Sequence, residues 1–278
     1  MERERMKIAA VLTCHNRREK TEQCIQTLAS GNKACDITFV VVDDGSTDGT
    51  GHRLTELAED YDIRIIYGNG NLFYSRSMRL GMEYVLKHLQ NKYDYLLLLN
   101  DDVKFFEHCL DKLCEQSRRM DGAVIVGATQ DQYGNMSYSA VKYTRGVHYR
   151  KLEIEEYFQQ ADTFNANCVL IPYKSFEQAG VMDAYYIHSL GDFDFGLMLK
   201  KYGNRIFTSK EYVGICDNNS IEGTWLDPSL GRWKRFQRKE SVKGAPWKQW
   251  FYFLRKHWGI GTAIWGSVTP YIRILLGR

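Results

Sequence analysis

The chain of 278 residues lacks several patterns that would define its class at once. It has no run of about 18 uninterrupted apolar residues, and its N-terminus has no signal-peptide stretch, so we expect no membrane-spanning segment. The 7 cysteines form no Cys-x-x-Cys pair, which excludes common zinc modules and is typical of a reducing cytosol. Neither the Gly-x-Gly-x-x-Gly nor the Walker pattern occurs. We therefore expect a cytoplasmic protein that is neither a dinucleotide-binding nor a P-loop enzyme.

Composition indicates a folded chain with an unusual C-terminal part. With 44% hydrophobic residues and only 4 prolines, the chain can bury a sizeable core. From Arg232 onward there are 11 Lys or Arg residues and one acid, Glu240. All 6 tryptophans also occur late, at Trp225, Trp233, Trp247, Trp250, Trp258 and Trp265. We predict a main domain over residues 1–215 and a basic, Trp-rich, mainly helical extension over 216–278.

Short apolar runs alternate with helical patterns through the first half of the chain. This alternation predicts an α/β fold, with a Rossmann-like, mostly parallel sheet flanked by helices. The expected strands are 8–13, 38–42, 63–67, 96–99, 123–127 and 205–209, and the expected helices are 17–28, 50–59, 75–89, 107–120 and 193–202. Two further segments, 132–141 and 163–172, are predicted to extend the sheet.

The strand at 96–99 ends in Asn100, Asp101 and Asp102. Two adjacent carboxylates repel each other unless a cation lies beside them, and open α/β sheets bind their ligands at this edge. We interpret the pair as a site for a divalent metal and an anionic ligand such as a nucleotide diphosphate. The alternative is an ordinary polar turn.

Two other loops at the same predicted edge carry candidate nucleotide ligands. Thr13 ends the first strand, while Asp43 and Asp44 end the second. A carboxylate there can accept the N3–H of a uracil or thymine ring, although helix capping is the competing explanation. The glycine-rich loop 68–71, followed by Arg76 at a helix start, suits phosphate, or is a plain turn.

Asp192 is the candidate general base. It is predicted to lie just before a helix among apolar neighbours, where partial burial raises a carboxyl pKa and favours proton transfer. Asp194 is expected in the first helical turn, where it can simply interact with the helix dipole.

In their order along the chain, four motifs resemble an inverting glycosyltransferase of family 2 with the GT-A fold. The motifs are VLTCHNR, VVDDGSTDGT, LLLLNDDV and GDFDFGLMLKKYG, and the resemblance covers about residues 7–213. The segment GNGNLFYSRSMRLG also resembles the G-D-G-N-L-W-W segment of bacterial members that build surface polysaccharides.

The resemblance assigns roles to individual positions. Asp102 would bind Mg²⁺ or Mn²⁺, and Asp192 would be the general base. Nucleotide-sugar binding would involve Thr13, Asn16, Arg17, Asp43, Asp44, Asn71, Arg76, Asn100 and Asp101; weaker acceptor-side candidates are His188, Asp194 and Trp225. Two positions depart from the family pattern: Asn100 replaces the first Asp of the DxD motif, and Gly191 replaces the Glu that precedes the catalytic Asp.

The expected function is metal-dependent transfer of a sugar from a UDP- or dTDP-sugar to a hydroxyl of a glycan or lipid-linked oligosaccharide, in bacterial surface polysaccharide synthesis. Two alternatives remain open from the sequence: a sugar-phosphate nucleotidyltransferase and a non-catalytic nucleotide-binding scaffold. Against the first, residues 13–17 contain no glycine.

The aromatic residues of the tail interleave with basic ones between Trp247 and Trp258. Such a helix suits an anionic surface, which would make the protein peripheral on the inner membrane face. The alternative is that its tryptophans pack on the catalytic domain. No nucleic-acid partner is expected, because no nucleic-acid-binding module is recognisable.

Overall fold

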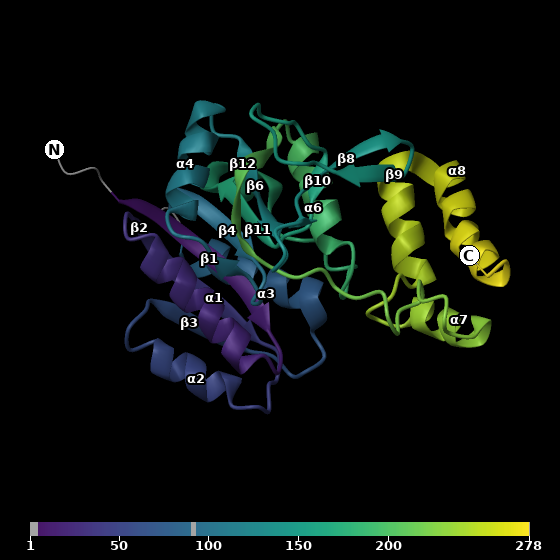
Figure 1. The fold of residues 1–278 in the computed structure, drawn as a ribbon, viewed down its shortest axis with the longest axis horizontal. Coiled ribbons are helices and arrows are strands. Elements are labelled where there is room, and N and C mark those ends of the chain that lie inside the picture. Colours follow the sequence, from purple (N-terminus) through teal and green to yellow (C-terminus); the bar gives the residue numbers. More distant parts are fainter. Residues whose placement is uncertain (1–4, 90–92, 278) are drawn as a thin grey trace.

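A computed structural model describes residues 5–89 and 93–277, and it contains one large mixed sheet with helices on both faces (Figure 1). The strands are, in spatial order, β3 (Ile63–Tyr67), β2 (Cys35–Asp43), β1 (Met6–Cys14), β4 (Tyr95–Leu99), β11 (Cys168–Pro172), β6 (Val124–Gln130), β12 (Ile206–Ile215) and β5 (Lys104–Phe105), with β7 (Met136–Tyr138) beside β6. The first four in this order run parallel, whereas β11 is antiparallel to both of its neighbours. The predicted α/β class with a mostly parallel sheet is confirmed.

Side chains of β1 are buried on both faces of the sheet, and helices cover each face. Ile8, Ala10 and Leu12 enter one apolar cluster, and Ala9 and Val11 enter the other. The first cluster is completed by α1 (Arg18–Gly31), α2 (Thr50–Leu57) and α4 (Cys109–Arg119), and the second by α3 (Phe73–His88), α5 (Tyr173–Ala179) and α6 (Gly191–Lys201). A strand buried on both faces needs an unbroken apolar sequence, which is the pattern that predicted it.

One local prediction is confirmed in part and another is wrong. The two segments expected to extend the main sheet, 132–141 and 163–172, supply β7 and β11 to it, but their remaining strand residues belong to a separate antiparallel sheet of β10 (Thr163–Phe164), β8 (Ala140–Arg145) and β9 (His148–Lys151). Asp192 lies inside the first turn of α6 and not before it, because Leu190 adopts a left-handed backbone (φ 72°) and the helix begins at Gly191.

The parallel strands place their following loops at one edge of the sheet. Cys14 pairs with Asp43, and Asp43 pairs with Tyr67, so the loops after β1, β2 and β3 begin side by side. On the other side of β1, Val11 pairs with Leu98, one residue before the end of β4. The predicted nucleotide and metal loops therefore meet.

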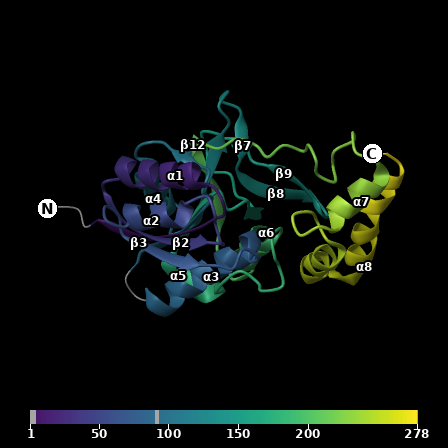
Figure 2. The ribbon, with the colours of Figure 1, turned by 90° about the horizontal axis from the view of Figure 1, so that it is seen from below.

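Beyond β12, the chain forms α7 (Arg232–Glu240) and α8 (Trp247–Leu275), which stand to one side of the sheet (Figure 2). A non-helical Gly259 (φ 84°) divides α8 into two arms. The arms pack together, since the Trp250 indole N–H donates to the Gly266 carbonyl at 3.0 Å. No helix in the described part of the chain combines the length and apolar character that a bilayer crossing demands. The domain boundary at residue 216 stays a prediction.

A buried carboxylate fastens the first arm of α8 to α6. Asp194 is 1% exposed and accepts hydrogen bonds from Tyr186 (3.1 Å), Lys256 (2.8 Å) and His257 (2.7 Å). Lys256 also pairs with Asp183 at 2.9 Å. Because Asp194 lies two residues after Asp192, this cluster fixes α8 relative to the helix that carries the candidate base.

Replacing Asp194 with alanine should leave the Lys256 charge half-satisfied and remove buried hydrogen bonds. We expect Asp194→Ala to lower the free energy of unfolding by about 3 kcal/mol. Asp36→Ala is the control, because it removes only the exposed ion pair to Arg5 and should cost about 1 kcal/mol or less. Urea unfolding measures both values, and equal losses would contradict a special role for the Asp194 cluster.

Candidate active site

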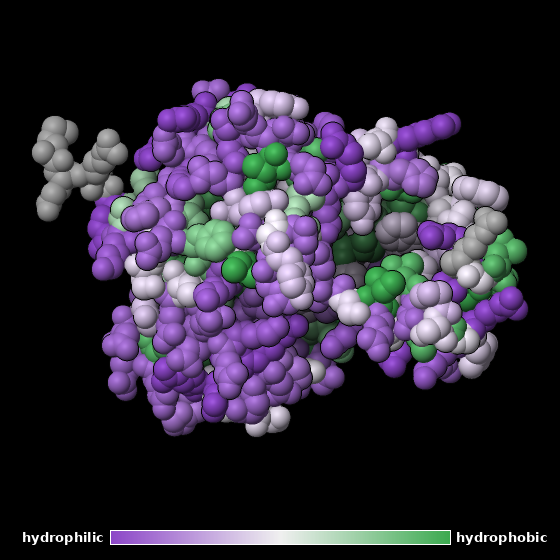
Figure 3. Space-filling model, viewed as in Figure 1, coloured by the Kyte–Doolittle hydropathy of each residue, from purple (hydrophilic) through white to green (hydrophobic). Residues whose placement is uncertain are grey.

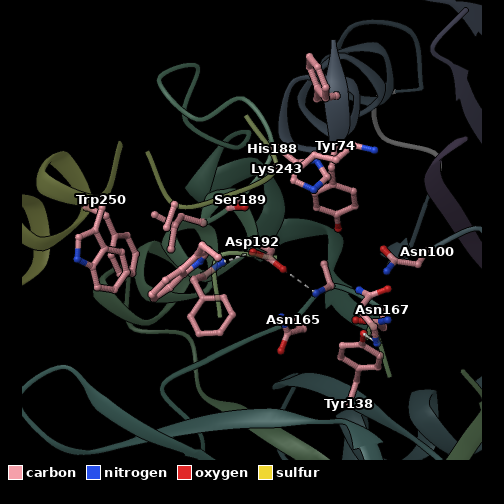
Figure 4. A pocket seen from close by; sticks show the side chains of 18 of the residues that line it. Tyr74, Asn100, Tyr138, Asn165, Asn167, His188, Ser189, Asp192, Lys243 and Trp250 are labelled. Atoms are coloured by element: carbon pink, nitrogen blue, oxygen red, sulfur yellow. Dashed lines mark hydrogen bonds between the residues drawn. The ribbon is translucent and has the colours of Figure 1, made fainter. Parts of the chain in front are cut away.

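A cavity of about 1060 Å³ lies between the loop edge of the sheet and the C-terminal helices. Figure 3 shows the hollow between these two parts of the molecule, and Figure 4 shows the side chains around it. Nine sequence-predicted residues line this one cavity: Thr13, Arg17, Asp44, Asn100, Asp101, Asp102, His188, Asp192 and Trp225. The loops that carry the four sequence motifs, which are far apart along the chain, therefore lie around one cavity.

The acidic corner of the cavity is bridged by an arginine. Nη1 of Arg17 lies 2.9 Å from Oδ1 of Asp101 and 2.9 Å from Oδ2 of Asp102. Burial, together with the adjacent Asp102, raises the pKa of Asp101 to about 6, although Arg17 acts in the opposite direction. The Cys216 thiol contacts Oδ1 of Asp102 at 3.6 Å. The repulsion expected for adjacent carboxylates is therefore offset by a side-chain cation.

This corner has the donor chemistry of a hard-cation site. Asp101 and Asp102 offer carboxylate oxygens, and Oδ1 of Asn100 is buried without a partner among the described residues. No cluster of three His, Cys, Asp or Glu side chains suited to a metal occurs in residues 5–89 and 93–277. Mg²⁺ needs none, because it is usually held by one or two carboxylates together with substrate phosphates. The residues present fit such an ion.

Asp44 organises the glycine-rich loop. Its Oδ1 accepts the N–H of Gly70 at 2.8 Å, and its Oδ2 accepts those of Leu72 and Phe73 at 2.9 Å each. These bonds satisfy N–H groups at and just before the start of α3. Asp44 therefore has the helix-capping role that the sequence offered as the alternative to nucleotide binding. An ionised carboxylate has about four lone-pair positions, which leaves one for a ligand donor.

Other predicted residues are not among those lining the cavity. Asn16 joins two loops, since its Oδ1 accepts the backbone N–H of Thr47 at 2.7 Å. Asp43 accepts the Ser46 N–H at 3.0 Å and borders a smaller hollow of about 320 Å³ behind the loop. Asn71 and Arg76 are exposed, and Asp194 belongs to the cluster on α8 described above.

Asp192 lines the same cavity as the acidic corner, and Figure 4 shows it apart from Asn100, the residue that precedes Asp101. Burial raises its pKa to about 6, while backbone N–H bonds from Phe193 (2.8 Å) and Ala166 (3.3 Å) favour the charged form. A carboxylate with this pKa is ionised near pH 7 and still basic enough to accept a proton.

The structure explains why glycine precedes Asp192. A Cβ at Gly191 would lie 2.5 Å from the Ser75 Oγ and 2.8 Å from its Cβ. Ser75 is itself fixed, because its hydroxyl donates to the His188 carbonyl at 2.7 Å. This position therefore has no room for the glutamate of the family pattern unless α3 moves away.

The family model for glycosyl transferase family 2 matches residues 9–180, more than half of the chain. The chain belongs to glycosyl transferase family 2. The family predicted from the motifs is thereby confirmed, and the protein is a glycosyltransferase. A comparison with curated protein sequences gives no match.

Solved structures with a similar fold support the GT-A architecture. The mannosyltransferase PcManGT from Pyrobaculum calidifontis, solved with GDP-Man and Mn²⁺, has a TM-score of 0.60 at 12% identity, covering 98% of this chain and 74% of its own. S. aureus TarS 1–349 with UDP-GlcNAc has a TM-score of 0.60 at 12% identity, and the match covers 97% of this chain and 81% of the TarS chain. GalNAc-T7 with UDP, GalNAc and Mn²⁺ has a TM-score of 0.60 at 10% identity, and the match covers 93% of this chain and 59% of the GalNAc-T7 chain.

Several residues of this glycosyltransferase cavity gave no usable sequence signal. Asn165 and Asn167 lie near Asp192 and the acidic corner, and the repeated Asn-x-Asn spacing was their only clue. The far end of the cavity is aromatic, and its rings come from the β8–β9 hairpin, α6 and α8. Their contacts include Tyr143–Trp258 and Tyr149–Phe193, at centroid distances of 4.8 and 5.5 Å.

The Asp44 bonds predict a measurable effect on nucleotide binding. In Asp44→Asn, an amide N–H₂ must face backbone N–H donors, so we expect a stability loss of about 2 kcal/mol and at least about tenfold weaker UDP binding. Asp131→Asn is the matched control, since that carboxylate accepts N–H groups of Tyr133 and Asn135 in an exposed turn outside the cavity. Calorimetric titration should show unchanged UDP affinity for the control; unchanged affinity for Asp44→Asn would contradict the assignment.

Proposed function

We propose that the protein is a metal-dependent, inverting glycosyltransferase that uses a UDP- or dTDP-sugar and glycosylates a hydroxyl of a glycan or lipid-linked acceptor. The supporting observation is that Asp192 and the Asp101–Asp102 corner line one cavity. A nucleotide-sugar placed between them has its diphosphate at the acidic corner and its sugar towards Asp192. Synthesis of a bacterial surface polysaccharide is the proposed setting.

The chemistry is a single displacement. Asp192 accepts the proton of the acceptor hydroxyl as that oxygen bonds to the anomeric carbon. The bond from this carbon to the diphosphate oxygen breaks on the opposite face, so the configuration inverts and the nucleoside diphosphate leaves with the bonding electrons. A divalent ion at Asp102, when bound, neutralises the charge of the departing diphosphate. Arg17 supplies a second positive charge at the same corner.

The Asp44 loop is compatible with the proposed uracil or thymine base. The free lone-pair position of Asp44 can accept the N3–H of uracil or thymine, a donor that adenine and cytosine lack. The Thr13 hydroxyl, now donating to the Val42 carbonyl at 3.1 Å, lines the same end of the cavity.

The acceptor side supports a large, partly apolar acceptor at a membrane surface. Aromatic rings line the far end of the cavity, and Lys243 and Arg273 are among the cavity's other lining residues. On the outside, the second arm of α8 exposes a row of apolar side chains at Ile260, Ile264, Trp265, Val268, Ile272 and Leu275. Exposed basic residues lie in α7 and in the first arm of α8, at Arg232, Lys234, Lys248 and Arg255, and their charge suits an anionic lipid surface.

Removing the base should separate binding from chemistry. Asp192→Asn keeps the side-chain shape, so we expect transfer to fall about 10²- to 10⁴-fold while UDP affinity stays within about twofold. Wild-type kcat should fall as pH drops below about 6, because Asp192 becomes protonated. Removal of divalent metal by EDTA should also abolish transfer. Asp111→Asn, which changes a half-buried carboxylate of α4 that does not line the cavity, is the control, and retained activity in Asp192→Asn would place the base elsewhere.

The exposed arm of α8 predicts lipid binding. Vesicles containing phosphatidylglycerol should co-sediment the wild-type protein better than vesicles of phosphatidylcholine alone. Replacing Trp265 and Ile272 together with serine should weaken this binding about tenfold or more, since both side chains leave water on binding. Tyr133→Ser is the control, because that ring is 80% exposed in a turn between β6 and β7. Equal sedimentation with both vesicle types would contradict the membrane proposal.

A further inference from the structure

Unpartnered polar atoms concentrate in the cavity. Among the described residues, six buried side-chain N or O atoms have no hydrogen-bond partner, and three of them belong to cavity residues: the Tyr74 hydroxyl, Oδ1 of Asn100 and Nδ1 of His188. Each such atom costs about 1–3 kcal/mol when it stays unpaired. Three in one cavity therefore indicate groups whose partners arrive with a ligand.

Tyr74 lies between two residues with a left-handed backbone, one next to it in sequence and one in the loop that faces it. Phe73, the residue before it, has a left-handed backbone with φ 59°, and so does Leu190 in the facing loop, with φ 72°. The N–H of Ser75 donates to the Ile187 carbonyl at 3.1 Å, which joins α3 to that loop. The Tyr74 and His188 rings meet edge to face at 6.4 Å. Strain of this kind persists where the surrounding structure needs a fixed geometry.

The three groups together offer a hydrogen-bond donor and acceptors, which is the combination that a sugar hydroxyl requires. Burial, with the charges of Asp192, Asp102 and Asp101, raises the pKa of Tyr74 well above its usual value, so its hydroxyl remains a donor. Burial, with nearby Lys243, lowers the pKa of His188 to about 4, so the ring is neutral near pH 7. Asn100 offers an acceptor oxygen. Sugar hydroxyls both donate and accept, as this set requires.

Figure 4 shows the Tyr74 hydroxyl pointing between Asp192 and Asn100. We propose that Tyr74, with Asn100 and His188, forms the subsite for the transferred sugar, and that the Tyr74 hydroxyl donates to one hydroxyl of that sugar. This inference rests on the proposed function, since it places the sugar between the diphosphate corner and the base. Tyr74 is thus a specificity-determining residue for the donor.

The test compares binding of nucleotides with and without a sugar. Calorimetry with Mn²⁺ measures the Kd of the wild-type protein for UDP and dTDP, and for UDP-glucose, UDP-galactose, UDP-GlcNAc and dTDP-glucose. The ratio of the bare-nucleotide Kd to the nucleotide-sugar Kd isolates the contribution of the sugar. Tyr74→Phe should reduce this ratio about tenfold for the best donor and leave the bare-nucleotide Kd within about twofold. Tyr173→Phe is the matched control, because it removes another buried, unpartnered hydroxyl that lies outside the cavity.

Monodeoxy forms of the best donor give a second readout that a structural role would not change. The wild-type protein should lose about tenfold in affinity for one deoxy position, and Tyr74→Phe should lose nothing at that position. Equal ratios in wild type and Tyr74→Phe, or an equal loss of bare-nucleotide affinity, would overturn the inference and leave the proposed function standing. Failure of the wild type to bind either nucleotide would overturn the proposed function itself.

Discussion

Two adjacent carboxylates, Asp101 and Asp102, end a strand buried on both faces and need positive charge beside them. Arg17 supplies it through one nitrogen shared by both carboxylates. Arg17 comes from the loop after β1, and the carboxylates come from the loop after β4, so this ion pair also connects neighbouring strands. Because Mg²⁺ and Mn²⁺ favour the same oxygens, a metal–diphosphate ligand must share this corner with Arg17 or displace it. The geometry of the donor end of the cavity follows from that constraint.

The sequence was sufficient for the parts of the site that depend on strand order. The run from Leu96 to Leu99 indicated a fully buried strand, and parallel pairing then placed its polar end beside the loops after β1 and β2. Local polarity was less informative. Asp43 and Asp44 are adjacent and alike in sequence, yet only Asp44 lines the large cavity, because Asp43 is the last residue of β2 and Asp44 already belongs to the loop that follows.

Features that depend on contacts distant in sequence were beyond prediction. The departure at Gly191 looked like a missing acidic neighbour, and its cause is the packing of Ser75, over 100 residues earlier. Tyr74 lies in the segment that resembles G-D-G-N-L-W-W, but no role in the site was predicted for it, since an aromatic at a helix start usually belongs to a core. The aromatic end of the cavity also arises only in three dimensions, where the β8–β9 hairpin meets α8.

The two arms of α8 place the tryptophans of the basic, aromatic tail in different surroundings. Trp250 and Trp258 face the cavity, as packing on the catalytic domain predicts, whereas Trp265 is 70% exposed on the second arm. The Asp194 cluster fixes the first arm to α6 and thereby positions the aromatic end of the cavity relative to Asp192. Membrane binding by the second arm stays a prediction.

The central claim is that one cavity holds the diphosphate at Asp102 and the sugar next to Asp192. Crystals of the protein soaked with Mn²⁺ and a UDP-sugar test it most directly, because Mn²⁺ can be located by its anomalous scattering. The structure predicts an anomalous peak within coordination distance of Asp102, bridged to the diphosphate, with the sugar between Tyr74 and Asp192. A metal or nucleotide bound elsewhere, with this cavity open and unoccupied, would contradict it.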